Sequence, residues 1–187
     1  MDKCIVCSSK NLTNVIRLGL HPPADSFLKT QDIESQKLHQ LGCQLCNDCG
    51  HLQNQVLVSN NERYEDIDYS YTSSNSKISM SHWDEYFETV SVKTELVEND
   101  HIVEFGSNDG YLTNLFNVKF DATGIEPSPY LAKISSQNGL DVINGYLCKD
   151  TIDQAIKKKG LCKLIYGNNV FNHISELNES TSAIKSG

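Results

Sequence analysis

The sequence predicts an α/β protein with a small metal-binding module in its N-terminal part. Two C-x2-C motifs lie within roughly the first fifty residues, which is the pattern of a zinc site. From His101 onward, short apolar runs alternate with helical patterns, and this alternation predicts a parallel sheet with right-handed crossovers. We expect a zinc-binding domain over 1–58, a tyrosine- and serine-rich loop with a linking helix over 59–98, and a partial α/β domain over 99–187.

Length, composition and charge exclude several classes of protein. The chain has 187 residues and a formal net charge of −8, and this charge argues against a nucleic-acid partner held by phosphate contacts. The sequence has no apolar run of about 18 residues, so we expect no membrane partner. Its first residues lack the apolar core of a secretory signal, so we expect a cytoplasmic protein. Seven cysteines, odd in number and closely paired, then indicate metal binding over disulfides.

The paired cysteines predict one structural zinc ion. Each C-x2-C turn directs two thiolates at one ion, and a closed four-thiolate site leaves no open coordination position for catalysis. Cys43 extends the second pair to C-x2-C-x2-C, so one cysteine is spare. Gly50 favours the pair directly before it, because the residue after the second cysteine often needs a positive φ. The expected ligands are Cys4, Cys7, Cys46 and Cys49. The alternative is a set of free thiols in a reduced cell.

Two segments connect this module to the α/β part. Residues 64–76 are polar and rich in tyrosine and serine, without helical or strand periodicity. We interpret them as a linker, with the alternative that they lay phenols and hydroxyls over a ligand. Apolar residues then recur at helical spacing and predict an amphipathic helix over about 78–98, with Trp83 in the core.

The α/β part is expected to contain four strands and the helices between them. The strands are predicted at 101–105, 121–126, 140–144 and 162–166, and the helices at about 110–117, 128–138 and 150–159. The first strand ends in a turn from Gly106 to Gly110, which would present backbone N–H groups to a ligand. Glu126 follows Gly106 by 20 residues, about where an acidic side chain binds ribose hydroxyls. The turn lacks a full G-x-G-x-x-G motif, so nucleoside binding and a plain strand-to-helix turn are both open.

Polar residues also follow the fourth predicted strand. Asn168 and Asn169 come directly after it, and His173 lies a few residues further on. The carboxyl ends of parallel strands border the ligand crevice of such sheets. His173 is the residue there whose ordinary pKa lies near neutrality, so it is a candidate acid or base. A structural histidine is the alternative.

Taken together, these motifs resemble the sugar C-methyltransferase family. Members are S-adenosylmethionine-dependent enzymes that methylate a carbon of nucleotide-linked keto-deoxysugars. The matching stretches are Cys4-x2-Cys7, Leu18-Gly-Leu-His-Pro-Pro-Ala-Asp-Ser-Phe-Leu28, Cys46-x2-Cys49 with Leu52-Gln53, Tyr69-Ser-Tyr-Thr-Ser-Ser74, Val103-Glu-Phe-Gly-Ser-Asn-Asp-Gly110, Gly124-Ile-Glu-Pro127 and Asn168-Asn-Val-Phe-Asn-His-Ile174. The resemblance covers nearly the whole chain.

The resemblance implies a fold, two cofactors and a site. It implies a zinc-binding N-terminal domain followed by a Rossmann-like, class I methyltransferase domain that binds S-adenosylmethionine. The cofactor-binding residues it implies are Gly106, Ser107, Asn108, Asp109, Gly110, Glu126, Pro127, Asn168 and Asn169. His173 would be the catalytic base or acid. A tyrosine of the Tyr-x-Tyr-x-Ser-Ser stretch would assist it, at Tyr71 or alternatively at Tyr69.

The departure from the family pattern is at the end of the sequence, Ile184-Lys-Ser-Gly187, which falls inside the helix expected after the fourth strand. Family members continue with further strands and a C-terminal domain, so we expect this chain to hold an incomplete Rossmann-like sheet and to lack sustained turnover by itself. Two other classes remain open. One is a non-catalytic zinc-ribbon and nucleoside-binding interaction module. The other is a fragment of a nicotinamide-dependent oxidoreductase, which the missing third glycine of the turn argues against.

Overall fold

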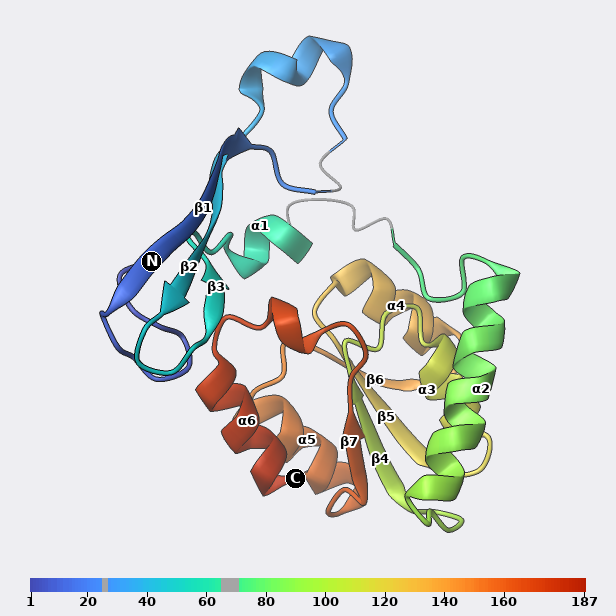
Figure 1. Ribbon diagram of the computed structural model, residues 1–187. Coiled ribbons are helices and arrows are strands. Elements are labelled where there is room, and N and C mark those ends of the chain that lie inside the picture. The colour runs from blue at the N-terminus through green and yellow to red at the C-terminus, as the bar shows by residue number, and fades with distance from the viewer. Residues whose placement is uncertain (25–26, 65–70) are drawn as a thin grey trace. The chain divides into compact units, whose positions relative to one another are not determined.

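The structure is a computed structural model that describes residues 1–24, 27–64 and 71–187 (Figure 1). The contacts of the chain divide it into two compact units. The first unit comprises Met1–Ser70 with Ser175–Asn178, and the second comprises Tyr71–Ile174 with Glu179–Gly187. The three-part division expected at residues 58 and 98 stays a prediction.

The first unit is built on a three-stranded antiparallel sheet with the strand order β1-β2-β3. Its strands are β1 (Leu12–His21), β2 (His39–Cys46) and β3 (Leu52–Asn54), and its helices are the short 3-10 helix η1 (Thr30–Ser35) and α1 (Asn60–Tyr64). Two irregularities interrupt the pairing of β1 with β2, between Asn14 and Ile16 and between Arg17 and Gly19. Among the described residues of this unit, the hydrophobic residues that are buried are Cys4 and Cys46.

The second unit confirms the predicted α/β class with a parallel sheet. Four strands pair in the order β6-β5-β4-β7, and every pair is parallel. The strands are β4 (His101–Phe105), β5 (Asp121–Glu126), β6 (Asp141–Asn144) and β7 (Leu164–Tyr166). The helices are α2 (Lys77–Lys93), α3 (Tyr111–Asn117), α4 (Pro129–Gln137), α5 (Lys149–Lys159), the 3-10 helix η2 (Phe171–His173) and α6 (Leu177–Ser186).

Helices cover both faces of this sheet (Figure 1). Successive residues of a strand point to opposite faces, so Ile102 packs with α2 and α3 whereas Val103 packs with α5 and α6. The cluster under α2 and α3 comprises Trp83, Phe87, Ile102, Leu112, Phe116, Ala122 and Tyr166. The cluster under α5 and α6 comprises Val103, Phe105, Ile125, Ile143, Leu147, Ile152, Ala155 and Ala183. Both faces of the sheet are therefore apolar and buried, which fixes the positions of the strand ends.

The linking helix is shorter than the sequence predicts. Ser76 caps its N-terminus by accepting a hydrogen bond from the Ser79 backbone N–H at 3.1 Å. The helix ends at Lys93 instead of near residue 98, because Glu95 takes a left-handed conformation with φ of 52°. A left-handed residue stops the ladder of helical hydrogen bonds. Trp83 is buried in the core, as predicted.

In the described part of the chain, no helix combines the length and apolar character needed to cross a membrane.

Candidate functional site

The structure brings four cysteines together in the first unit. Their Sγ atoms all lie within 4.8 Å of one another. The Sγ atoms of Cys4 and Cys49 are 3.7 Å apart, and those of Cys7 and Cys46 are 3.6 Å apart. A tetrahedral zinc ion with Zn–S bonds of about 2.3 Å places its sulfurs about 3.8 Å apart. The four side chains are therefore placed close to the positions that a zinc ion requires, whereas Cys43 lies outside the cluster.

Two turns of the same form position these cysteines. The backbone N–H of Ser8 donates to the Cys4 carbonyl at 2.9 Å, and that of Gly50 donates to the Cys46 carbonyl at 2.9 Å. Ser8 and Gly50 both have a positive φ, of 62° and 75°. This confirms the conformation predicted for Gly50. The chain reverses after each C-x2-C pair, so both pairs point at one centre.

The electrostatics of the cluster call for a cation. A backbone hydrogen bond from His51 favours the Cys49 thiolate, but the neighbouring sulfurs outweigh it and raise the pKa of Cys49 to about 12. Burial disfavours the Cys46 thiolate, but backbone N–H groups of Cys49 and Asp48 lower the pKa of Cys46 to about 7. Four thiolates this close cannot all ionise near neutral pH unless a positive charge lies between them. A divalent metal ion supplies that charge.

In the second unit, the predicted glycine turn follows β4. Gly106 and Gly110 have φ values of 67° and 81°. A Cβ atom on Gly106 would come within 2.4 Å of the Val170 side chain, so a larger residue does not fit there. The backbone N–H groups of Gly106 and Ser107 both donate to the Ile125 carbonyl, at 2.7 and 3.1 Å. These bonds bind the turn to the end of the neighbouring strand.

Glu126 lies at the end of β5, beside this turn, and is 4% exposed. Its carboxylate accepts hydrogen bonds from the backbone N–H of Asn108 at 2.7 Å and from that of Ser128 at 2.9 Å. Burial raises the pKa of Glu126, although both N–H groups favour the ionised form. A carboxylate can accept more than two hydrogen bonds, so Glu126 retains capacity to accept bonds from ligand hydroxyls.

Two buried polar atoms near the ends of β4 and β7 lack a hydrogen-bond partner within the described structure. They are the Ser107 Oγ and the Asn168 Nδ2. β4 and β7 are neighbouring parallel strands. Ser107 and Asn168 are each the second residue after one of these strands, and Gly106 and Gly167 are the residues between. Buried polar groups are nearly always paired. Unpaired groups at this edge of the sheet are what a polar ligand site leaves when the ligand is absent.

The remaining predicted cofactor residues lie in the same unit. Pro127 is half-buried, and its carbonyl accepts a hydrogen bond from the Asn144 side chain at 3.2 Å. Asn169 is exposed and has a φ of 56°. The role of each in cofactor binding stays a prediction.

The predicted catalytic residues are placed only in part. His173 is an exposed residue at the end of η2, just after β7. Tyr71 is 44% exposed and begins the second unit. Tyr69 lies outside the described residues.

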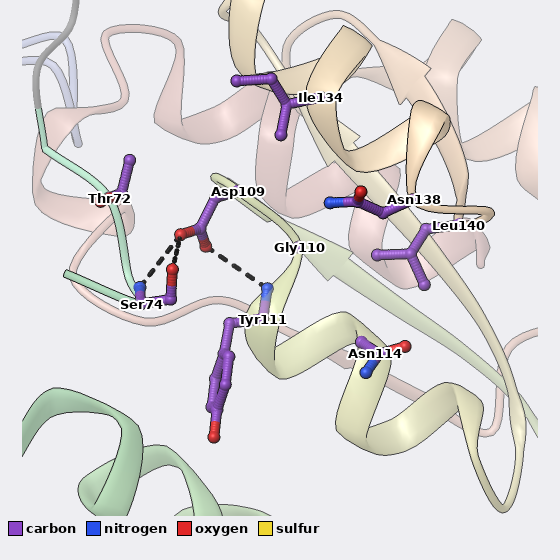
Figure 2. Close-up of a pocket in the computed structure, with 9 residues that line it drawn as sticks. All are labelled: Thr72, Ser74, Asp109, Gly110, Tyr111, Asn114, Ile134, Asn138 and Leu140. Carbon is purple, nitrogen blue, oxygen red and sulfur yellow. Dashed lines mark hydrogen bonds between the residues drawn. The ribbon is translucent and has the colours of Figure 1, made fainter. Parts of the chain in front are cut away.

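A shallow pocket of about 490 Å³ lies beside the glycine turn (Figure 2). It is lined by Thr72, Ser74, Asp109, Gly110, Tyr111, Asn114, Ile134, Asn138 and Leu140. Of the predicted cofactor residues, only Asp109 and Gly110 line it, whereas Ser107 and Glu126 do not. The pocket therefore lies at one side of the turn and does not coincide with the predicted ribose site.

Sequence comparison relates the chain to known proteins. Residues 4–64 match a family described as a putative zinc binding domain. The chain is 24% identical over 186 residues to the C-methyltransferase NovU of Streptomyces niveus, and the match covers 98% of this chain and 44% of that protein. The chain thus spans less than half the length of this relative. The first match confirms the predicted zinc-binding N-terminal part, and the second is a similarity to a C-methyltransferase.

Solved structures give weaker similarities. An S-adenosylmethionine-dependent methyltransferase from Clostridium acetobutylicum matches with a TM-score of 0.44 and 16% identity, over 57% of this chain and 45% of that one. Magnesium protoporphyrin IX methyltransferase from Synechocystis, solved with bound S-adenosylmethionine, matches with a TM-score of 0.43 and 13% identity, over 57% of this chain and 53% of that one.

Proposed function

We propose that this chain is part of an S-adenosylmethionine-dependent C-methyltransferase that acts on a nucleotide-linked keto-deoxysugar. The similarity to NovU along 98% of the chain supports this assignment most directly. The glycine turn and Glu126, at the ends of adjacent parallel strands, supply the matching site.

The residues at the edge of the sheet fit this cofactor. Glu126 would accept hydrogen bonds from the ribose hydroxyls, and its two backbone donors hold its carboxylate in place for that contact. The unpaired Ser107 Oγ and Asn168 Nδ2 would supply further polar contacts. Bound S-adenosylmethionine supplies an activated methyl group, so the protein itself needs only to provide and align a carbon nucleophile.

The nucleophile would form by removal of a proton next to the sugar ketone. His173 suits this step, because it is exposed just after β7 and a histidine side chain is the commonest general base in enzymes. The Tyr71 phenol would donate a hydrogen bond to the ketone oxygen, where negative charge develops as the enolate forms. The four cysteines would hold a structural zinc ion, because a closed thiolate set has no open position for substrate.

Calorimetric titration tests the proposal. The zinc-loaded chain should bind S-adenosylmethionine and S-adenosylhomocysteine and should not bind NAD. An Asn114→Ala variant, changed at an exposed asparagine of α3, serves as the matched control and should bind both ligands as the parent does. Binding of NAD in preference to both sulfur-containing ligands would contradict the proposal.

A second candidate function is a non-catalytic interaction module. One observation favours it: β1 exposes several apolar side chains, with Val15 at 58%, Leu18 at 54% and Leu20 at 63%. Exposed apolar groups gathered on one strand are typical of contact surfaces. Sustained methyl transfer by this chain from radiolabelled S-adenosylmethionine to a nucleotide-linked 4-keto sugar, lost in a His173→Ala variant, would rule out a purely non-catalytic module. The same result would contradict the expected lack of turnover.

A further inference from the structure

The segment Tyr71–Ser74 is fastened to the glycine turn by two side chains. The Asn108 amide accepts a hydrogen bond from the Ser73 backbone N–H at 2.8 Å and donates one to the Tyr71 carbonyl at 3.1 Å. The Asp109 carboxylate accepts from the Ser74 backbone N–H at 3.0 Å and from the Ser74 hydroxyl at 2.6 Å (Figure 2). Each side chain thus binds the segment through two hydrogen bonds.

These contacts occupy two of the side chains that family resemblance assigns to the cofactor. Asn108 is 8% exposed, and its amide oxygen and nitrogen both bind the segment. The second oxygen of Asp109 accepts from the Tyr111 backbone N–H at 3.4 Å. The backbone N–H of Asn108 donates a hydrogen bond at 2.7 Å to the carboxylate of Glu126, the residue predicted to bind the ribose.

A second set of bonds holds the segment from α2. The Ser73 carbonyl accepts hydrogen bonds from the Ser79 hydroxyl at 2.6 Å and from the Trp83 indole N–H at 3.2 Å. Trp83 is the only tryptophan in the sequence and is 7% exposed. Because its indole N–H binds the segment, the fluorescence of Trp83 should change when the segment is released from α2.

We propose that Asn108 and Asp109 are positioning residues that hold the Tyr71–Ser74 segment on the glycine turn, and that Asn108 links this segment to Glu126. The functional meaning rests on the proposed function, since it takes Glu126 as the ribose ligand and Tyr71 as a catalytic residue. Asn108 has a φ of 54°, a conformation unusual for a residue with a side chain. This conformation lets its backbone N–H contact Glu126 while its amide contacts the segment. A change at Glu126 should therefore alter the hydrogen bonds of the Tyr71–Ser74 segment, and a change in the segment should alter the position of Glu126.

Amide hydrogen exchange measured by NMR tests the link directly. Asn108→Gly removes the amide but accepts the positive φ, so exchange of the Ser73 N–H should become about two- to tenfold faster, the order of one lost hydrogen bond. Asp109→Ala should do the same at Ser74. In both variants the Trp83 emission should shift to longer wavelength, and acrylamide should quench it more strongly.

Two further variants separate positioning from a general loss of structure. Asn108→Asp keeps the acceptor for the Ser73 N–H, so the Ser73 exchange rate should return toward the parent value. Asn114→Ala, in the same pocket but without a part in the link, should change neither exchange nor emission (Figure 2). Glu126→Ala should speed exchange at Ser73 by a smaller factor, because it removes the acceptor of the Asn108 N–H.

The outcomes distinguish this proposal from the proposed function. Parent-like exchange at Ser73 and Ser74 in folded Asn108→Gly and Asp109→Ala proteins would overturn the positioning role. Parent-like exchange at Ser73 in Glu126→Ala would overturn the link to Glu126. If exchange and emission change as expected while calorimetry detects no cofactor, the link stands and the proposed function fails.

Discussion

The two units of this protein are stabilised in different ways. In the second unit, two apolar clusters pack against opposite faces of the parallel sheet. In the described part of the first unit, the buried hydrophobic residues are Cys4 and Cys46. Val15, Leu18 and Leu20 are more than half exposed. The second unit thus has an apolar core of its own, and the first has a cysteine cluster in its place.

This difference shows how a short segment can fold with little apolar burial. A segment this small buries too little apolar surface to offset its loss of conformational entropy. A zinc ion replaces the missing core, since binding of a structural zinc contributes directly to the free energy of folding. The two units should therefore respond differently to loss of metal and to loss of a core side chain.

Removal of zinc should have the largest effect. A structural zinc contributes an apparent free energy of about 10–16 kcal/mol in small zinc-finger peptides. A chelator, or a Cys46→Ser substitution, should therefore unfold the first unit and leave the second folded. In an NMR spectrum the amide signals of residues 1–64 should collapse to random-coil positions, while those of 101–166 stay dispersed.

Cys43→Ser is the matched control, because Cys43 lies in the same strand but outside the cluster. It should retain one zinc per chain by metal analysis. Zinc release by Cys43→Ser, with retention in Cys46→Ser, would show that the wrong cysteine has been assigned.

A core substitution should have the converse effect. Phe116 is fully buried between α3 and the sheet, in ring contact with Phe87 at 5.0 Å between centroids. Phe116→Ala should lower the free energy of unfolding of the second unit by about 3–5 kcal/mol. Urea denaturation followed by Trp83 emission measures this unit specifically. Zinc content should stay unchanged, and loss of zinc would mean that the two units do not fold independently.

The sequence was most informative where one physical requirement determines the residue pattern. Strands β4 and β5 begin and end where predicted, because each carries apolar residues at its centre and is bounded by the turn residues and helical patterns on either side. The cysteine spacing identified the cluster, and Gly50 distinguished Cys46 from Cys43, because the turn after the second cysteine needs a positive φ. Local rules decided both features.

Features that depend on distant contacts were missed. Strand β1 was not predicted, because two irregularities in its pairing with β2 disrupt the alternation of apolar and polar residues. Residues 71–74 were interpreted as a linker. The bonds that fasten this segment involve Asn108 and Asp109, which lie 35 to 37 positions away in the chain. Hydrophobic periodicity in the sequence does not predict contacts between residues so far apart in the chain.

Replacement of Glu126 should have an intermediate effect on ligand binding. Glu126→Ala should weaken S-adenosylmethionine binding by about 1.5–3 kcal/mol, the value of a hydrogen bond to a charged group. Calorimetry measures the change, and circular dichroism confirms that the variant is folded. Glu126→Gln keeps an acceptor but loses the charge, so its affinity for S-adenosylmethionine should lie between those of Glu126→Ala and the parent. Unchanged affinity in folded Glu126→Ala would contradict the ribose role.

The last prediction concerns the pH dependence of stability, which depends on a buried acid in the second unit that the proposed chemistry does not use. Glu104 is 6% exposed, and its Oε2 accepts hydrogen bonds from the Thr113 hydroxyl at 2.5 Å and from the Tyr166 hydroxyl at 3.2 Å. Burial raises the pKa of Glu104 to about 8, although both hydroxyls favour the ionised form. We therefore expect Glu104 to be protonated in the folded protein at neutral pH.

The pH dependence of stability follows from this protonation. Between an unfolded pKa near 4.5 and a folded pKa of about 8, the folded state holds one proton more than the unfolded state. Stability must then fall as pH rises through this window, by at most about 1.4 kcal/mol per pH unit for one proton. Glu104→Gln removes the titration, so urea denaturation of the second unit from pH 5 to 8 should give a flatter profile than the parent. The zinc-loaded protein should be used throughout, so that thiol titration in the first unit does not contribute. Parallel profiles for parent and variant would show that Glu104 is ionised in the folded protein, held by its two hydroxyl donors.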